Sequence, residues 1–144
     1  MSTYQIACKI GSTDYSANLG LEIWLDDQLM YNIDHVLDEI PVNFEVNEDE
    51  AEHEFKFVMK NKNSSHTTID ESGNILADAR IVITDVAFDE VVLGQIFIDN
   101  TTYIHDFNGT QPTTTTKFYG EMGCNGTVSL QFFTPIYLWL LEHM

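Results

Sequence analysis

Hydrophobic and polar residues alternate with a period of two along most of this chain. The first clear run places Tyr4, Ile6, Cys8 and Ile10 on one side, with other residue types between them. A period of two turns such a set toward one face of a β-sheet. The apolar members of the later runs are Leu21, Ile23 and Leu25; Val42, Phe44 and Val46; Phe55, Phe57 and Met59; Ile81 and Ile83; and Val128, Leu130 and Phe132. The pattern predicts many strands, each buried on one face.

Turn-forming residues separate these runs. Asp26, Asp27 and Gln28 stand between two apolar stretches and predict a hairpin. Residues 70–74, Asp-Glu-Ser-Gly-Asn, have turn chemistry at every position. The threonine-rich segment Thr110–Lys117 is predicted to be a surface loop. The stretch Ile136–Glu142 follows Pro135 and is expected either as a short helix or as a last strand.

Many short strands with few helix signals are typical of two packed antiparallel sheets. We therefore predict an all-β fold, an antiparallel β-sandwich of jelly-roll-like type. The chain has 144 residues, with no internal repeat and no linker composition. This length suits one domain, so residues 1–144 are expected to form a single β-sandwich domain.

The charge of the chain is strongly acidic, with 23 Asp and Glu against 6 Lys and Arg and a net charge of -17. Nucleic-acid binders need basic groups that neutralise phosphates, and an acidic surface repels anionic lipids. No apolar run approaches the ~20 residues of a membrane helix. The N-terminus lacks a basic region followed by an apolar one, which is the pattern of a signal peptide. We expect no nucleic-acid partner, no membrane insertion and no secretion signal.

The two cysteines, Cys8 and Cys124, do not make a disulfide framework. Cys8 belongs to an inward-facing alternation, so a buried reduced thiol is expected there. A single bridge between Cys8 and Cys124 is the alternative.

The sequence contains no arrangement typical of an active site. None of the five histidines belongs to a nucleophile elbow or a zinc-binding helix motif. His53 lies within an acidic run, residues 45–54, and is expected to be a solvated residue of a strand. A small glycoside-active enzyme would need a carboxylate in an apolar pocket, and nothing singles one out. We therefore predict that the protein is not an enzyme.

Oxygen-rich segments raise the question of a metal. Asp70 and Asp78, around the turn at residues 70–74, could supply oxygens to Ca²⁺, and a plain hairpin turn is the alternative. The acidic run at residues 45–54 allows cation binding as an alternative to a charged, solvated loop. No other cofactor is expected.

Aromatic residues next to small and polar ones concentrate in the last third of the chain. Such groups stack on sugars or anchor protein interfaces, and the alternative is that the rings fill the core. The candidates for contact with a partner or a glycan are Tyr103, His105, Asp106, Phe107, Asn108, Phe118, Tyr119, Tyr137 and Trp139. The run from Phe132 to Leu141 is apolar on all sides, so we expect it to be either wrapped by the fold or docked on a partner.

Four segments carry a family resemblance: Val58–Lys62, Asp70–Ile75, Asp85–Glu90 and, most specifically, Thr134–Glu142. Together they resemble small uncharacterised proteins of marine tailed phages of the cyanophage-type myoviruses. The resemblance implies a virion accessory or structural protein, either a capsid decoration or a tail or baseplate component. Such a protein would be made in the host cytoplasm. It would contact other virion proteins and occur as a homo-oligomer or in repeated copies.

A second, shorter resemblance covers the hairpin Leu21–Met30. This segment is similar to Ca²⁺-dependent xylan-binding modules, which are jelly rolls. The resemblance supports the predicted fold. It also implies an alternative function, that of a carbohydrate-binding module, with or without Ca²⁺, for host or surface glycan recognition.

Overall fold

The computed structural model describes residues 3–13, 19–36, 39–60, 67–69, 71–72, 75–105, 112–122 and 125–143, of which 67–69 and 75–78 are described without their side chains. Strands make up most of these residues, which confirms the predicted all-β class. The elements in chain order are β1 (Thr3–Ser12), β2 (Gly20–Leu25), β3 (Gln28–Ile33), β4 (Ile40–Asn47), β5 (Glu52–Lys60), β6 (Thr67–Ile69), β7 (Ile75–Asp78), β8 (Ile81–Phe88), β9 (Val91–Val92), α1 (Gln95–Asn100), β10 (Thr101–His105), β11 (Thr114–Lys117), β12 (Glu121–Met122), β13 (Gly126–Phe133) and α2 (Ile136–His143).

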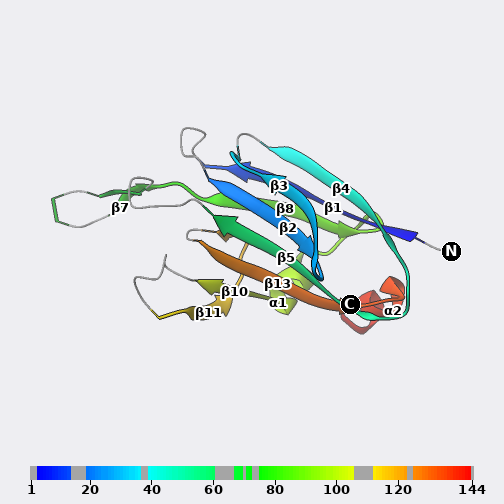
Figure 1. The fold of residues 1–144 in the computed structure, drawn as a ribbon. Helices are drawn as coiled ribbons and strands as arrows, with labels where there is room; N and C mark the ends of the chain where they lie inside the picture. Colours follow the sequence, from blue (N-terminus) through cyan, green and yellow to red (C-terminus); the bar gives the residue numbers. More distant parts are fainter. Residues whose placement is uncertain are drawn as a thin grey trace.

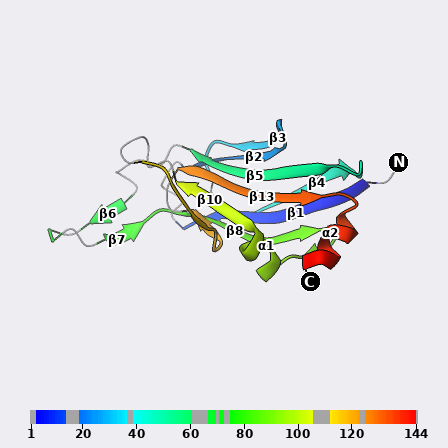
Figure 2. The same ribbon diagram turned by 90° about the horizontal axis from the view of Figure 1, so that it is seen from below.

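The main strands form two antiparallel sheets that face each other, so the predicted β-sandwich is confirmed (Figure 1). One sheet has the order β12-β8-β1-β4, with β9 also paired to β8, and the other has the order β11-β10-β13-β5-β2-β3. The chain passes back and forth between the sheets along its length, because neighbours in sequence often belong to opposite layers. β6 and β7 form a separate hairpin that extends away from the end of the sandwich opposite the N-terminus (Figure 2).

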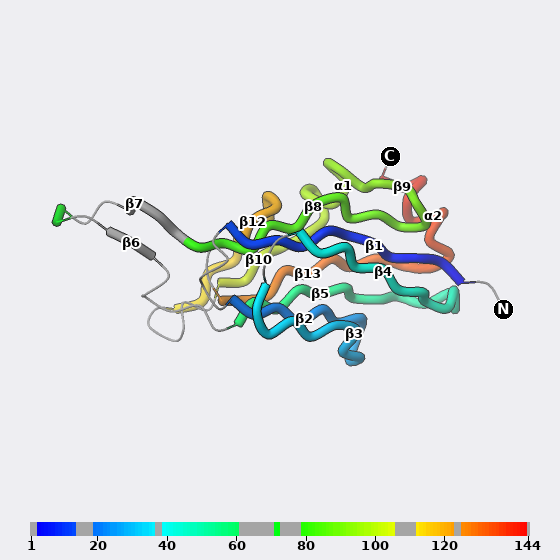
Figure 3. Tube along the Cα trace, turned by 90° about the horizontal axis from the view of Figure 1, so that it is seen from above, coloured from blue at the N-terminus to red at the C-terminus, as the bar shows by residue number. Residues whose placement is uncertain are grey.

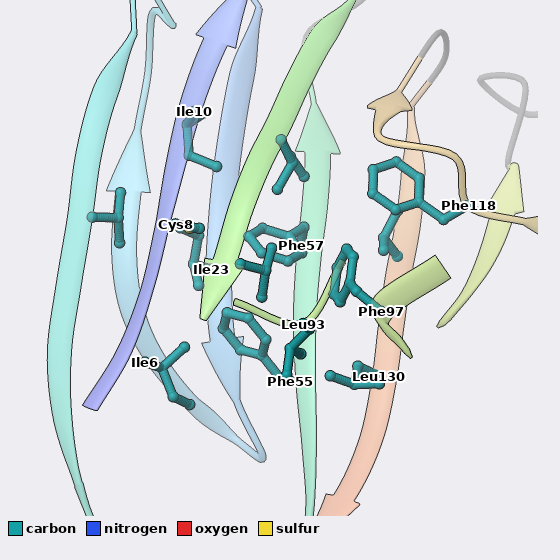
Figure 4. Packing of buried hydrophobic residues seen from close by; sticks show 14 of the residues in the cluster. Ile6, Cys8, Ile10, Ile23, Phe55, Phe57, Leu93, Phe97, Phe118 and Leu130 are labelled. Carbon is teal, nitrogen blue, oxygen red and sulfur yellow. The ribbon is translucent and has the colours of Figure 1, made fainter. Parts of the chain in front are cut away.

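The core lies between the two sheets and contains the apolar members of the alternating runs. Ile6, Cys8 and Ile10 of β1 face Ile23 and the phenylalanine rings of β5 across this space (Figure 4). The short helix α1 adds Phe97, whose ring lies edge-on to Phe57 and to Phe118, at 6.4 and 5.9 Å between centroids. α1 was not predicted, since its six residues are too few to show a helical period.

Of two connections predicted from the sequence, the β2–β3 hairpin is confirmed and the loop at Thr110–Lys117 is only partly correct. The β2–β3 hairpin turns at Asp26 and Asp27 as predicted, with Asp26 in the left-handed region at φ 54°. The predicted loop at Thr110–Lys117 is wrong for its last four residues, which form the edge strand β11 on β10. β-Branched threonines suit a strand whose side chains are exposed, and this favours pairing over a free loop.

The end of the sandwich that contains the first residues of β1 is closed by α2 (Figure 3). The ring of Trp139 packs against Phe88 of one sheet and Phe132 of the other, at 5.7 and 6.3 Å between centroids. The C-terminal stretch was expected either as a short helix or as a last strand, and it forms the helix. Neither helix in the described part of the chain has the length and apolar character needed to cross a membrane.

Candidate functional site

α2 has two apolar faces, of which only one is covered. Ile136, Trp139 and Leu140 are buried against the sandwich. The opposite side presents Tyr137, Leu138 and Leu141, whose exposed fractions are 52%, 55% and 69%. We call these three residues the α2 outer face. The expectation that the fold wraps this segment is therefore confirmed for one side of α2, whereas docking on a partner stays a prediction for the exposed side.

The connection between β4 and β5 holds the start of this helix. The Glu48 carboxylate accepts a hydrogen bond from the backbone N–H of Ile136 at 2.8 Å, and a negative charge is favourable at a helix N-terminus. The Thr134 hydroxyl lies 3.1 Å from Oδ1 of Asp49 and accepts a bond from the backbone N–H of Ala51 at 3.0 Å. The acidic run is therefore more than a solvated loop, since Glu48 and Asp49 take part in specific contacts.

His53, at the start of β5, lies between two carboxylates. Its Nδ1 atom is 2.7 Å from Oδ2 of Asp26, and its Nε2 atom is 2.7 Å from Oδ1 of Asp49. The imidazole packs on the ring of Phe132, and only 8% of the side chain is exposed. His53 lies in a strand as expected, but the expectation that it is solvated is wrong, because the β2–β3 turn, the connection before β5 and one apolar ring enclose it.

The two carboxylates set the ionisation of His53. Burial lowers its pKa, but the hydrogen bonds and charges of Asp26 and Asp49 outweigh this effect, so the pKa is raised above the ordinary value. The pKa of Asp49 is lowered, first by its hydrogen bond to His53 and further by the bond from Thr134. The imidazolium form of His53, with N–H groups at both ring positions, matches two acceptors. We call Asp26, Asp49 and His53 the histidine clamp.

An acidic cleft adjoins the α2 outer face. Its lining residues are Thr3, Tyr4, Gln5, Glu45, Asp89, Glu90 and Tyr137. The Tyr137 hydroxyl donates a short hydrogen bond to the Asp89 carboxylate. That bond, with burial and the charges of Asp89, Glu48 and Glu90, raises the pKa of Tyr137. Asp89 and Glu90 occupy the turn between β8 and β9 with φ of 51° and 71°, a conformation that non-glycine residues seldom adopt.

Three of the predicted contact residues have no surface to offer a partner. Tyr103, Phe118 and Trp139 are 3%, 0% and 2% exposed, so these rings fill the core, as the alternative for the aromatic cluster held. Tyr103 and Phe118 lie edge-on to each other in the core, at 6.0 Å between ring centroids.

The other candidates do not come together in one site. His105, on β10, stacks on Tyr103 at 3.9 Å and contacts the Thr116 hydroxyl at 2.9 Å, and burial lowers its pKa. Tyr119 is 73% exposed beside β8, whereas Tyr137 lies on α2. Asp106, Phe107 and Asn108 lie outside the described residues.

The exposed ring of Tyr119 borders a recess of about 430 Å³ between β8, α1 and the segment before β12. The recess has an apolar floor that includes Val86 and Phe97, and charged residues at its rim. Glu121 there is 2.7 Å from Arg80, and Asp85 is 3.4 Å from Lys9. An exposed ring beside ion-paired polar groups offers both stacking and hydrogen bonds.

The calcium prediction stays untested. Asp70 lies outside the described residues, as does the side chain of Asp78. Among the residues that the structure describes, no group of three or more His, Cys, Asp or Glu is arranged to hold a metal ion.

Cys8 is a free, buried thiol, as expected.

Comparison with known proteins adds no relative, since no family model, curated protein or solved structure matches this chain.

The features that sequence reasoning missed are the histidine clamp and the acidic cleft. Both join turns and strand ends that are far apart in the chain, such as Asp26 with His53 and Asp89 with Tyr137. No local pattern could have indicated these pairs.

Proposed function

We propose that the protein is a non-enzymatic accessory or structural protein of a phage particle, a capsid decoration or a tail or baseplate component, that acts through protein–protein contacts. The observation that carries the proposal is the α2 outer face. Tyr137, Leu138 and Leu141 leave half or more of each large apolar side chain in water. Apolar patches of this kind mark interaction sites, and covering them is favourable by about 25 cal/mol per Å².

The arrangement of the helix suits a contact surface. Trp139 fixes α2 across the ends of both sheets, and Glu48 holds its first turn, so the outer face is presented on a supported element. A surface that is ordered before binding loses little conformational entropy when a partner covers it. Tyrosine, here Tyr137, is one of the residue types enriched among the anchors of interfaces.

We propose a phage particle as the location because the sequence resembles small proteins of marine tailed phages. The repeated symmetry of a particle would place many copies of one contact side by side. The acidic surface away from this contact would then face outward, where net charge of one sign keeps particles apart. The site of action is the virion, after synthesis in the host cytoplasm.

The test is incorporation into purified particles, measured by quantitative mass spectrometry of separated heads and tails. We expect the wild-type chain in stoichiometric amount in one fraction. Leu138→Ser combined with Leu141→Ser should remove it from that fraction. Leu29→Ser is the matched control, since Leu29 is 43% exposed on the edge strand β3 and does not belong to the α2 outer face, and it should leave incorporation unchanged. A wild-type chain found only in the lysate overturns the proposal.

Carbohydrate binding is the second candidate, and the recess beside Tyr119 favours it. The exposed ring offers a stacking face, and Asp85, Glu121 and Arg80 offer partners for hydroxyl groups. A glycan array with and without Ca²⁺ tests this function. Binding that is lost in Tyr119→Ala but kept in Tyr137→Ala supports it. An array without any bound glycan rejects it.

A further inference from the structure

We propose that the partner segment that covers the α2 outer face is basic as well as apolar, and that one of its lysine or arginine side chains enters the acidic cleft. This inference rests on the proposed function, since it gives the chemistry of the partner for the same surface. The occupant that we infer is a positively charged segment of another protein. The experiment below distinguishes this segment from a lipid surface and from a second copy of the chain.

Tyr137 joins the apolar surface to the acidic one. Its ring belongs to the α2 outer face with Leu138 and Leu141, and its hydroxyl bonds Asp89 within the cleft. A segment that covers the two leucines therefore reaches the cleft without further length. A cation placed there would lie beside the exposed tyrosine ring, whose face also attracts positive charge.

The charge of the cleft is not balanced within the described part of the chain. No described lysine or arginine forms an ion pair with Glu45, Glu48, Asp89 or Glu90. The basic residues with described ion pairs are engaged elsewhere: Lys9 with Glu39 and Asp85, His53 with Asp26 and Asp49, Lys56 with Glu54, Lys60 with Glu22 and Asp34, Arg80 with Glu121, and Lys117 with Asp99. The cleft thus offers acceptors with no described internal cation to satisfy them.

The chemistry of the cleft suits the end of a basic side chain, and its size leaves room for one. Its volume is about 420 Å³, and its rim is carboxylate, amide and hydroxyl groups. Lysine brings three N–H donors and arginine five, so either can bond several of these oxygens at once. The net charge of -17 would attract such a segment from a distance.

A second copy of this chain is a poor occupant of the same surface. A symmetric contact through the α2 outer face would bring Glu45, Asp89 and Glu90 of one copy close to the same residues of the other. Like charges brought together in this way oppose association. Complementary charge therefore favours a different, basic protein.

The experiment uses two synthetic amphipathic peptides with identical leucine positions, one with lysine and one with glutamate at the polar positions. Binding to the full-length chain is measured by isothermal titration calorimetry. We expect the lysine peptide to bind and the glutamate peptide to fail. The affinity should fall as salt rises from about 50 mM to about 500 mM, because added salt screens exposed charges.

Variants of matched charge locate the contact. Glu45→Gln with Glu90→Gln removes two charges from the cleft, and neither side chain has a described hydrogen bond or ion pair to lose. We expect the affinity for the lysine peptide to fall about threefold to tenfold. The control, Glu39→Gln with Glu71→Gln, removes two exposed charges elsewhere and should change the affinity less than about twofold.

Each remaining outcome has one meaning. Equal loss in both double variants shows unspecific charge attraction and overturns the inference, as does absence of binding by the lysine peptide. Loss in Leu138→Ser with Leu141→Ser, together with no loss in the cleft variant, leaves the proposed surface intact and rejects the basic partner. Binding of neutral phosphatidylcholine vesicles through the two leucines, or dimerisation through them, replaces the protein partner and overturns the inference.

Discussion

The Nε2 atom of His53 lies 2.7 Å from Oδ1 of Asp49, while its Nδ1 atom lies at the same distance from Oδ2 of Asp26. One ring therefore links the β2–β3 turn to the connection between β4 and β5. Asp49 in turn contacts the Thr134 hydroxyl just before α2. The ionisation of a single histidine thus bears on three segments at the end of the sandwich that carries the α2 outer face.

The stability of the fold should depend on pH through the histidine clamp. The raised pKa of His53 means that its contribution is complete below the ordinary histidine value of ~6.5 and is lost as pH rises through the folded pKa. The lowered pKa of Asp49 means that its contribution is present above the ordinary value of ~3.9 and is lost as pH falls through the folded pKa. The clamp is therefore strongest near about pH 5.

His53→Gln tests this dependence, with thermal unfolding measured from about pH 4 to about pH 9. The variant should unfold at lower temperature than wild type near about pH 5, by the equivalent of roughly 1–3 kcal/mol. The difference should shrink as pH rises, because neutral His53 can donate only one of the two hydrogen bonds. A difference that stays constant with pH would show that packing on Phe132, rather than charge, accounts for the effect.

Gly126→Ala should destabilise the sandwich at the pairing of β10 with β13. A Cβ at this position would lie 2.1 Å from the carbonyl oxygen of Ile104, so the backbone must move. Such overpacking costs typically about 1–3 kcal/mol or more, measured as a lower urea midpoint. Gly94→Ala is the comparison, since its Cβ meets nothing within 4 Å and its cost comes only from a φ of 54°. A larger loss in Gly94→Ala would contradict this reading of β13.

The Cys8 thiol should be unreactive in the folded protein. Burial raises its pKa to about 12, so the thiolate that reacts with alkylating reagents is scarce at pH 8. In a Cys124→Ser background, iodoacetamide should leave Cys8 unmodified in native buffer and label it fully in denaturant, as read by intact-protein mass spectrometry. Rapid labelling in native buffer would show that β1 opens on the time scale of the reaction.

Tyr4→Phe should leave stability unchanged or increase it by up to about 1 kcal/mol. The Tyr4 ring packs edge-on against Phe88 and Phe132, and its buried hydroxyl has no hydrogen-bond partner in the described part of the structure. Burial, followed by the charges of Asp49, Asp26 and Glu48, raises the pKa of this hydroxyl far above its ordinary range. Removal of an unsatisfied polar atom keeps the packing intact. A clear loss of stability in chemical denaturation would reveal a bond that Tyr4 makes.

The sequence by itself determined the class of this fold. Alternation with a period of two assigns Ile6, Ile23 and Phe57 to the core, because side chains on a strand point to opposite faces in turn. The same local reasoning found the β2–β3 hairpin and the inward Cys8. It failed at Thr114–Lys117, where four exposed residues show no apolar alternation and pairing with the preceding strand β10 decided between loop and β11.

Only the tertiary structure decided which side chains are available to a partner. Tyr103, Phe118 and Tyr119 look alike in the sequence, yet two are buried and one is exposed, because exposure depends on which strands and helices pack nearby. The histidine clamp and the acidic cleft likewise depend on contacts between residues far apart in the chain, such as His53 with Asp26. Strand period is a local property of the chain, whereas the meeting of Tyr137 with Asp89 follows from the closure of the sandwich by α2.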